Sequence, residues 1–294
     1  MEYAAPEGTT LVATLGGGSV FDVALVHDGA RDVVCKRLSP GAAREPAARA
    51  AMVREARALT LAKHAALPAL IRVGSDARGP FLIETHVAGV SVRGLVEGWR
   101  ARGEAVPPRL VAHVAEAAAI ALAELHALAD DAGPIALSHG DIGPDHLILG
   151  PLGEVRFVDL GAARFRGMEP SLETGDRGTL PFVAPEVARG EAAPSAATDV
   201  YALAATLLFL AVGEPLTAAR EAGAMLLEVG EGGVLRSLLG RAVGLDDEAR
   251  DALHRALSPD PGGRAASARD LAIALGESGG RGRSAQAIRS PNAT

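Results

Sequence analysis

The segment His139-Gly-Asp-Ile-Gly-Pro-Asp-His146 decides the fold of this 294-residue chain. Before it, Arg109 to Leu128 carries apolar residues at the 3.6-residue spacing of an amphipathic helix. After it, two short apolar runs, Leu147–Leu149 and Val155–Val158, flank the turn residues Pro151-Leu-Gly153. Short β-rich runs on either side of a turn predict a hairpin. We therefore expect a helix, a loop and a hairpin in that order.

Two aspartates bracket the predicted hairpin, Asp141 before it and Asp159 at its end, 18 residues later. Carboxylates at the two ends of one hairpin can face a single site, where one orients a hydroxyl nucleophile and the other binds a divalent cation. The alternative for each aspartate alone is an ordinary turn residue with no chemical role. The pair in this setting favours the site.

The predicted elements divide the chain into two parts. One helix, from Pro46 to about Lys63, interrupts a strand-rich first part; the strands are Thr10–Leu15, Val20–Val26, Asp32–Leu38, Leu70–Gly74 and Phe81–Thr85. From Pro108 onward helical periodicity dominates, as in 197–212 and 247–257. This order predicts an α+β fold with two lobes, and the crossing between them, from Thr85 to Ser91, is a natural ligand site.

The same division predicts the domain limits. We expect an N-terminal extension over residues 1–9, a small β-rich lobe over about 10–86 and a larger helical lobe over about 87–276. Residues 277–294 are rich in Gly, Ser and Arg, which is typical of a disordered tail.

Three consecutive glycines, Gly16, Gly17 and Gly18, lie between the first two predicted strands. Glycines at such a place let backbone N–H groups approach phosphates closely. An ordinary hairpin turn explains the same residues, so the motif is weak when it stands alone.

Lysine is rare in this chain, since only Lys36 and Lys63 of the 29 Lys and Arg residues are lysines. Lys36 lies on the third predicted strand, where alternation places it on the same face as Val34. An apolar side chain beside an ammonium suits an adenine ring and its phosphates. A buried lysine needs a carboxylate partner, and Glu55 in the predicted helix is the candidate. Lys63 is interpreted as a solvated helix end.

These residues belong to seven motifs in order, namely VVCKRL (33–38), VREARAL (53–59), HGDIGPDHLIL (139–149), VDLGAAR (158–164), GTLPFVAPE (178–186), TDVYALAATL (198–207) and SPDPGGR (258–264). The set resembles the eukaryotic-like Ser/Thr protein kinases of bacteria, over about residues 10–276. The resemblance implies a bilobal protein kinase-like fold, with ATP and Mg²⁺ (or Mn²⁺) as cofactors. It also implies a protein substrate or signalling partner.

The resemblance implies a role for each matched position. Lys36 would hold the α- and β-phosphates while pairing with Glu55, Asp141 would be the catalytic base, and Asp159 would bind Mg²⁺. The implied nucleotide-binding positions are Gly16, Gly17, Gly18, Val23, Val34, Lys36, Ile83 as the gate, and the backbone groups of Glu84 and His86 as the hinge. The remaining implied roles are Ser/Thr specificity for Thr179, phosphorylation for Ser171 and Thr174, a bracing ion pair for Glu186 and Arg264, and anchoring of the catalytic loop (139–146) for Asp199.

Four positions depart from the family pattern. Phe21 stands where the third glycine of the phosphate loop belongs, and Gly140 replaces the arginine that pairs with a phosphorylated activation segment. Gly143 replaces the lysine that neutralises the transferred phosphoryl group, for which Arg177 is a candidate substitute. His146 stands where an asparagine binds the second Mg²⁺; it either packs beside the catalytic base, donates a hydrogen bond, or binds a softer ion such as Mn²⁺ or Zn²⁺.

Composition restricts the partners and the compartment. A net charge of -7 and a pI of about 5.6 argue against a nucleic-acid partner. The single Cys35 excludes an internal disulfide and indicates a reducing compartment. The first residues lack the pattern of a signal peptide, and the longest apolar stretch, Val200 to Val212, is too short to span a bilayer. We expect a cytoplasmic protein with no membrane span.

Three functions stay open at this point. The retained Lys36, Glu55, Asp141 and Asp159 favour a Ser/Thr kinase of weak activity, which moves the γ-phosphate of ATP to a protein hydroxyl. The departures at 143 and 146 favour a pseudokinase that binds nucleotide or acts as a scaffold. A small-molecule phosphotransferase related to aminoglycoside or choline kinases also has a His-Gly-Asp loop, but the GTLPFVAPE and DPGGR segments count against it.

Overall fold

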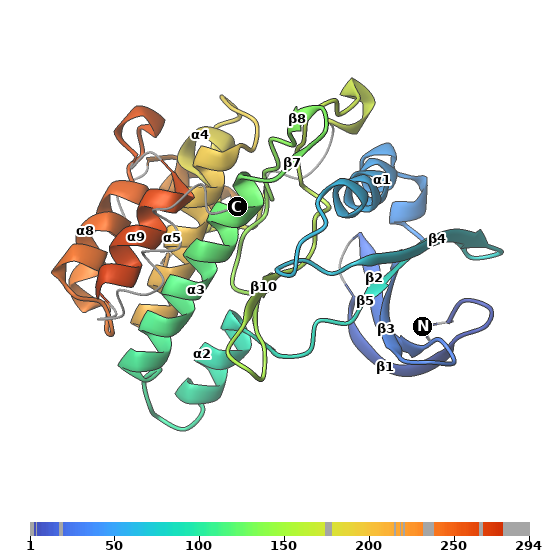
Figure 1. Ribbon diagram of the computed structural model, residues 1–294, viewed down its shortest axis with the longest axis horizontal. Helices are drawn as coiled ribbons and strands as arrows, with labels where there is room; N and C mark the ends of the chain where they lie inside the picture. The colour runs from blue at the N-terminus through green and yellow to red at the C-terminus, as the bar shows by residue number, and fades with distance from the viewer. Residues whose placement is uncertain are drawn as a thin grey trace.

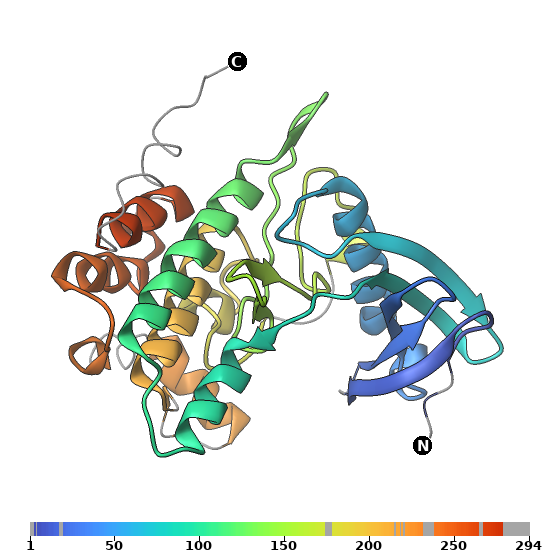
Figure 2. The ribbon, with the colours of Figure 1, turned by 60° about the horizontal axis from the view of Figure 1, so that its bottom comes forward.

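In the computed structural model the chain forms two lobes, one mainly of strands and one mainly of helices (Figure 1). The structure describes residues 3, 5–17, 20–173, 178–214, 216–217, 219, 221–231, 238–264 and 267–278. The turned view shows the same two parts, with the N-terminal strands and the helix Pro46–Leu61 set apart from the helices of the larger lobe (Figure 2).

Five antiparallel strands form the sheet of the smaller lobe, in the spatial order β1-β2-β3-β5-β4. Their bounds are β1 Thr10–Gly17, β2 Phe21–His27, β3 Asp32–Leu38, β4 Leu70–Asp76 and β5 Gly79–Thr85. The pairing of β1 with β2 forms the predicted hairpin, in which Gly16 lies opposite Val23. Because β3 lies between β2 and β5, its side chains are the most enclosed of the sheet.

The two faces of this sheet carry different residues, as strand alternation requires. One face forms an apolar layer of Ala24, Val26, Val33, Cys35, Phe81 and Ile83. On the other face Lys36 lies opposite Val23 of β2, and Val34 lies opposite Glu84 of β5. The second face therefore combines valines with charged groups, and it is the face that carries the candidate site.

Helix α1 (Pro46–Leu61) begins with Pro46 at its first turn, as predicted, and follows the short 3₁₀ helix η1 (Ala42–Arg44). Its buried side is made largely of alanines, together with Met52, Arg54 and Glu55. Met52 packs with Leu38 of β3. The small side chains let the helix approach the sheet closely, and Glu55 reaches Lys36 of β3.

The larger lobe is built on helices, with three short strands where it meets the smaller lobe. The helices are α2 Val92–Arg100, α3 Pro108–His126, α4 Pro185–Ala188, α5 Ala196–Val212, α6 Ala222–Glu231, α8 Asp247–Ala256 and α9 Ala268–Ser278, with the 3₁₀ helices η2 Pro170–Leu172, η3 Leu238–Arg241 and η4 Pro261–Gly263. The strands β6 Val90–Ser91, β9 Leu147–Leu149 and β10 Val155–Phe157 form one sheet, and β7 Ala129–Asp130 pairs with β8 Gly133–Pro134. The hairpin predicted after the 139–146 loop is thus present.

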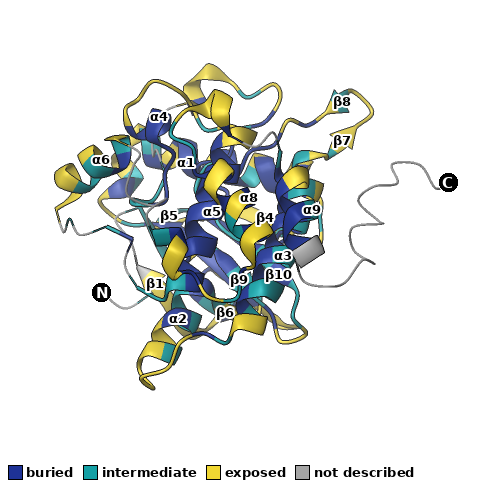
Figure 3. Ribbon diagram, turned by 90° about the vertical axis from the view of Figure 1, so that its left-hand side faces the viewer, coloured by how far each residue is buried: buried dark blue, intermediate teal, exposed yellow. Residues whose placement is uncertain are grey.

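Helix α5 is the centre of the larger lobe and is buried along most of its length (Figure 3). The Ser195 hydroxyl caps its first turn by accepting the N–H of Thr198 at 3.4 Å, and Gly213 ends it with a left-handed backbone, φ 75°. The cap fixes the position of Asp199 in the first turn, where the residue is buried. The fixed helix therefore holds this carboxylate against the neighbouring loop.

The predicted α+β, two-lobed fold is confirmed, and the strands of the small lobe lie within two residues of the predicted runs. No helix among the described residues is long and apolar enough to cross a membrane. The predicted disordered tail falls, from residue 279 on, outside the part of the chain that the structure describes.

Candidate active site

Lys36 is the buried cation on the sheet face described above. Its ammonium donates to Glu55 Oε1 of α1, the partner that the sequence suggested. A second carboxylate, Glu84 of β5, places its Oε1 3.3 Å from Lys36 Nζ. One ammonium thus lies between two carboxylates that are both almost fully buried.

The charges of this cluster do not balance. Burial alone would lower the pKa of Lys36, but the carboxylates of Glu55, Glu84 and Asp159 outweigh it and raise the pKa, so the ammonium stays charged. Burial raises the pKa of Glu55 to about 7, even though Lys36 acts to lower it, and burial raises the pKa of Glu84 as well. Within the described part of the chain, Glu55 Oε2 and Glu84 Oε2 are buried without hydrogen-bond partners. The site therefore contains two buried carboxylate oxygens that can still accept hydrogen bonds.

The predicted gate and hinge positions require a correction. Ile83 lies opposite Cys35, on the apolar face turned away from Lys36, so the prediction that it forms the gate is wrong. Glu84 lies within β5 between Val34 and Leu70, and its carboxylate, rather than its backbone, reaches the site. Strand alternation explains the error, because a shift of one residue moves a side chain to the other face.

The structure separates the two predicted hinge positions, since Glu84 lies within β5 and His86 follows it. Residues after β5 connect the lobes, and His86 among them is exposed. The backbone N–H of Val87 makes no hydrogen bond within the described residues, whereas the N–H of Thr85 donates to the Ala69 carbonyl at 2.9 Å. The sequence did not lead us to predict the contact of Glu84 with Lys36. A glutamate directly after the apolar run Phe81-Leu-Ile83 could have indicated it.

Asp199 of α5 binds the backbone of the predicted catalytic loop (139–146) through hydrogen bonds. One carboxylate oxygen accepts the N–H of His139 at 2.7 Å, and the other accepts the N–H of Gly140 at 2.9 Å. His126 of α3 contacts the same carboxylate at 3.0 Å. The backbone that leads into Asp141 is thus held by a buried charge-assisted contact, which rigidifies the loop.

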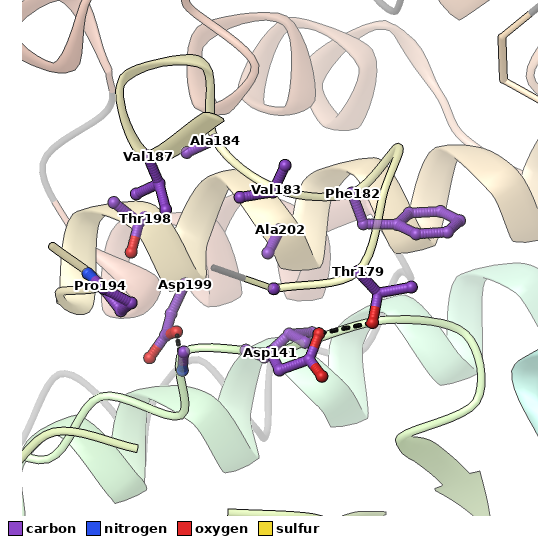
Figure 4. Close-up of a pocket in the computed structure, with 13 residues that line it drawn as sticks. Asp141, Thr179, Phe182, Val183, Ala184, Val187, Pro194, Thr198, Asp199 and Ala202 are labelled. Carbon is purple, nitrogen blue, oxygen red and sulfur yellow. Dashed lines mark hydrogen bonds between the residues drawn. The ribbon is translucent and has the colours of Figure 1, made fainter. Parts of the chain in front are cut away.

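Asp141 lies at the floor of a small pocket beneath the segment that precedes α4 (Figure 4). Its Oδ1 accepts the hydroxyl of Thr179 at 2.7 Å, and the two groups face each other in Figure 4. His146 Nδ1 lies 3.5 Å from Asp141 Oδ2, and the same nitrogen contacts the Asp141 carbonyl at 2.8 Å. The carboxylate of Asp141, the predicted catalytic base, thus lies between a hydroxyl and an imidazole.

Asp159 follows β10 and has a left-handed backbone, φ 69°, a conformation that aspartate tolerates better than most residues. Its Oδ1 accepts the N–H of Gly161 at 3.1 Å. Burial acts to raise the pKa of Asp159, but Lys36, His146 and the Gly161 N–H outweigh it and hold the pKa at about 2. The carboxylate is therefore ionised at neutral pH.

His146 lies between the two aspartates, because its Nε2 is 3.7 Å from Asp159 Oδ2 while its Nδ1 faces Asp141. Burial acts to lower the pKa of His146, but Asp159 and Asp141 outweigh it, and the pKa is raised. Among the described residues no group of three His, Cys, Asp or Glu side chains is arranged to hold a metal by itself. The structure thus places His146 beside the predicted catalytic base and the predicted metal ligand at once.

Gly140 and Gly143, which both depart from the family pattern, differ in how much room their surroundings leave for a side chain. Gly140 has φ 80°, and a Cβ there would lie 2.3 Å from the carbonyl oxygen of Ala162, so this backbone admits no side chain. At Gly143 the nearest atoms to a Cβ are Phe182 Cδ2 and Thr179 Cβ, both at 3.9 Å, which is ordinary contact. The loop conformation therefore requires glycine at 140 but not at 143.

The phosphate-loop prediction lies only partly within the described residues, since Gly16 and Gly17 end β1 whereas Gly18 is outside them. Phe21, where the family has glycine, packs with the cluster of Leu38 and Met52 rather than standing free in the loop. This packing explains how β2 accommodates the large side chain.

The remaining predicted positions are Ser171, Thr174 and Arg177, together with the predicted pair of Glu186 and Arg264. Thr174 and Arg177 are outside the described residues, whereas Ser171 is exposed in η2. Glu186 and Arg264 form a buried two-pronged ion pair, with Arg264 Nη2 2.6 Å from Glu186 Oε2. The pair joins α4 to the residue that follows η4.

A family model described as the protein kinase domain matches residues 9–271. The chain belongs to the protein kinase family. The lobes and the matched motifs agree with this membership.

The similar proteins include several Ser/Thr kinases of bacteria. A probable serine/threonine-protein kinase of Streptomyces coelicolor is 28% identical over 210 residues, 68% of this chain and 29% of that protein. The serine/threonine-protein kinase PknL of Mycobacterium tuberculosis is 32% identical over 161 residues, 54% of this chain and 37% of that protein. PknK of Mycobacterium bovis is 31% identical over 138 residues, 45% of this chain and 12% of PknK. These matches confirm the resemblance predicted from the motifs, and the aligned part spans well under half of each relative's length.

Proposed function

We propose that this kinase domain is an ATP-dependent Ser/Thr phosphotransferase of reduced rate, acting on a hydroxyl of a protein substrate. The observation that carries the proposal is the convergence of four charged residues from separate elements: Lys36 of β3, Glu55 of α1, Asp141 of the catalytic loop and Asp159 after β10. Such a set positions phosphates and a nucleophile, which is most of what phosphoryl transfer requires of a protein.

In this proposal the nucleotide lies against the sheet face that carries Lys36. Val23 and Val34, which share that face, pack on the adenine ring, and Lys36 binds the α- and β-phosphates. The hinge contacts come from the backbone of Thr85 and Val87, counted outward from Glu84, and the glycines from Gly16 approach the phosphates. The pairing with Glu55 keeps the ammonium directed toward the phosphates.

The residues present fit one Mg²⁺ better than two. Asp159 is an ionised oxygen ligand and about a third exposed, and Mg²⁺ is commonly held by one or two carboxylates together with phosphate oxygens. At the second position His146 offers a ring nitrogen, which Mg²⁺ disfavours. A bound Mg²⁺ would supply charge neutralisation at the phosphates.

Asp141 is the group that acts on the substrate. Its carboxylate orients the incoming hydroxyl and takes the proton as the hydroxyl oxygen bonds to the γ-phosphorus and ADP leaves. Thr179 already supplies a hydroxyl to Asp141 at 2.7 Å, which supports the ability of this carboxylate to hold such a group. With glycine at 143, the catalytic loop supplies no cation to the transferred group there, so the step is expected to be slow.

Nucleotide binding tests the first half of the proposal. We expect ATP with Mg²⁺ or Mn²⁺ to raise the thermal midpoint of the purified protein, and Lys36→Met to remove most of that shift. Lys63→Met is the matched control, because Lys63 is exposed at the end of α1 and should leave the shift unchanged. The absence of any shift in the unaltered protein would refute nucleotide binding.

A pseudokinase is the second candidate, and Gly143 and His146 are the observations that favour it. It predicts nucleotide binding without transfer, so radiolabelled ATP separates the two functions. The protein substrate or partner, like the cytoplasmic location and the lack of nucleic-acid binding, stays a prediction.

A further inference from the structure

Arg54 precedes Glu55 on α1 and is buried, with 4% of its surface exposed. A buried guanidinium needs acceptors for its N–H groups, because leaving them unpaired is costly. By contrast Arg57, one turn further along α1, has a side chain that is 44% exposed and pairs with Glu169 at 3.0 Å. Of these two arginines of α1, Arg54 is therefore the one that needs acceptors inside the protein.

Two acceptors of Arg54 lie on the segment that follows Asp159. Its Nε donates to the carbonyl oxygen of Gly161, and its Nη1 donates to the carbonyl oxygen of Leu172 at 2.6 Å. Gly161 in turn donates its N–H to Asp159 Oδ1 at 3.1 Å. A continuous path of hydrogen bonds therefore runs from the guanidinium through one residue to the carboxylate.

The neighbouring residue of α1 holds the same stretch. Glu55 Oε1 accepts the N–H of Leu160 at 3.3 Å while it also pairs with Lys36. Two successive side chains of one helix thus bind two successive residues after Asp159. Because Asp159 has a left-handed backbone, its conformation depends on such external contacts.

On its other side, this segment faces position 140 of the catalytic loop. That position is glycine, so the loop contributes no cation there. Gly140 cannot carry a side chain, since the carbonyl oxygen of Ala162 occupies the place of its Cβ at 2.3 Å. The contacts that Arg54 makes with carbonyl oxygens need no phosphate on the segment.

We propose that Arg54 is a positioning residue, which holds Asp159 and the 160–172 stretch against α1 through the carbonyls of Gly161 and Leu172 and does so without phosphorylation. The inference rests on the proposed function only for its effect on nucleotide. Loss of Arg54 should release the stretch and weaken the metal-dependent part of ATP binding, because Asp159 is the proposed metal ligand.

The test compares Arg54→Gln, Arg54→Lys and the control Arg49→Gln, an exposed arginine of α1 that contacts the Ala43 carbonyl. All three are treated with phosphatase and shown by intact mass to carry no phosphate. The first readout is the ratio of ATP affinity with Mn²⁺ to ATP affinity without metal. Arg54→Gln should lower this ratio about tenfold, the factor that loss of a charged hydrogen bond carries. Arg54→Lys should lie between, and Arg49→Gln should match the unaltered protein. A general loss of stability would lower both affinities and leave the ratio unchanged.

The second readout, amide hydrogen exchange over residues 160–172, does not depend on nucleotide. Arg54→Gln should exchange faster there than Arg49→Gln, with no difference over α3 and α5. Equal exchange in these two variants would overturn the proposal. If the phosphate-free, unaltered protein bound ATP no more tightly with Mn²⁺ than without metal, the claim that Arg54 acts without phosphorylation would be overturned. If the unaltered protein binds no ATP but the exchange difference appears, the proposed function fails and the positioning role of Arg54 stands.

Discussion

Glu84 Oε1 lies 3.3 Å from Lys36 Nζ, so the ammonium that also pairs with Glu55 is shared by two buried carboxylates. Two buried negative charges beside one positive charge are unfavourable. The fold tolerates them because burial shifts the acid equilibria toward the neutral form, which raises the pKa of Glu55 to about 7.

This cluster predicts a dependence of stability on pH. The pKa of Glu55 is higher in the folded protein, at about 7, than its ordinary value of 4.5. The folded state therefore binds more protons between these values, so this group's stabilisation is present below 4.5 and is lost as pH rises through about 7. Glu84→Gln removes one raised acid and lowers the pKa of the other, so the fall in stability from pH 5 to 8 should become smaller. Thermal midpoints across that range measure it.

The control for this experiment is Glu97→Gln, since Glu97 is exposed on α2. That variant should follow the unaltered protein at every pH. An equally steep fall in Glu84→Gln would contradict the role of the shared ammonium.

The open space at Gly143 predicts a gain of activity. Gly143→Lys has ordinary van der Waals room for its Cβ and restores a cation beside the reacting phosphoryl group. We expect kcat to rise by about tenfold, part of the effect that one charge-stabilising group usually has. Gly98→Lys on α2, where a Cβ meets nothing within 4 Å, adds the same charge elsewhere and should leave kcat unchanged. A kcat unaffected by Gly143→Lys would show that this position does not limit the rate.

The position of His146 predicts the effect of an oxygen ligand there. His146→Asn should increase the rate and its dependence on Mg²⁺ concentration, by about tenfold in rate, because an amide oxygen suits Mg²⁺ better than imidazole does. His146→Ala removes the ring without adding an oxygen, so it should not produce the gain. A loss of rate in both variants would instead give the imidazole a role of its own.

The buried pair of Glu186 and Arg264 predicts a large loss of stability when one member is removed. Glu186→Ala leaves the Arg264 guanidinium buried without its carboxylate, which typically costs about 3 to 5 kcal/mol. Urea unfolding followed by circular dichroism measures this loss. The double variant Glu186→Leu with Arg264→Met should recover much of it, and a loss in the single variant below about 1 kcal/mol would contradict a bracing role.

The sequence predicted most of the fold because its periodic patterns are local. Alternation in β3 and the proline at the start of α1 determine those elements without distant contacts. The ordered motifs also placed Lys36 with Glu55 correctly. The gate was misplaced by one residue, since the pairing register of β5 depends on two neighbouring strands.

Other features depend on contacts between distant segments and left no local pattern. Arg54 meets Gly161 and Leu172 more than a hundred residues away, and nothing near position 54 indicates those partners. The same holds for Gly140, whose need for glycine comes from the carbonyl of Ala162.

The central claim is that Asp141, placed between Thr179 and His146, activates a hydroxyl for transfer from ATP. The most direct measurement is incorporation of label from γ-³²P ATP into a generic protein substrate in the presence of Mg²⁺ or Mn²⁺. The account predicts slow incorporation by the unaltered protein and none above background by Asp141→Asn, with ATP binding retained in both. Incorporation that persists in Asp141→Asn, or ATP binding with no incorporation by either protein, would contradict it.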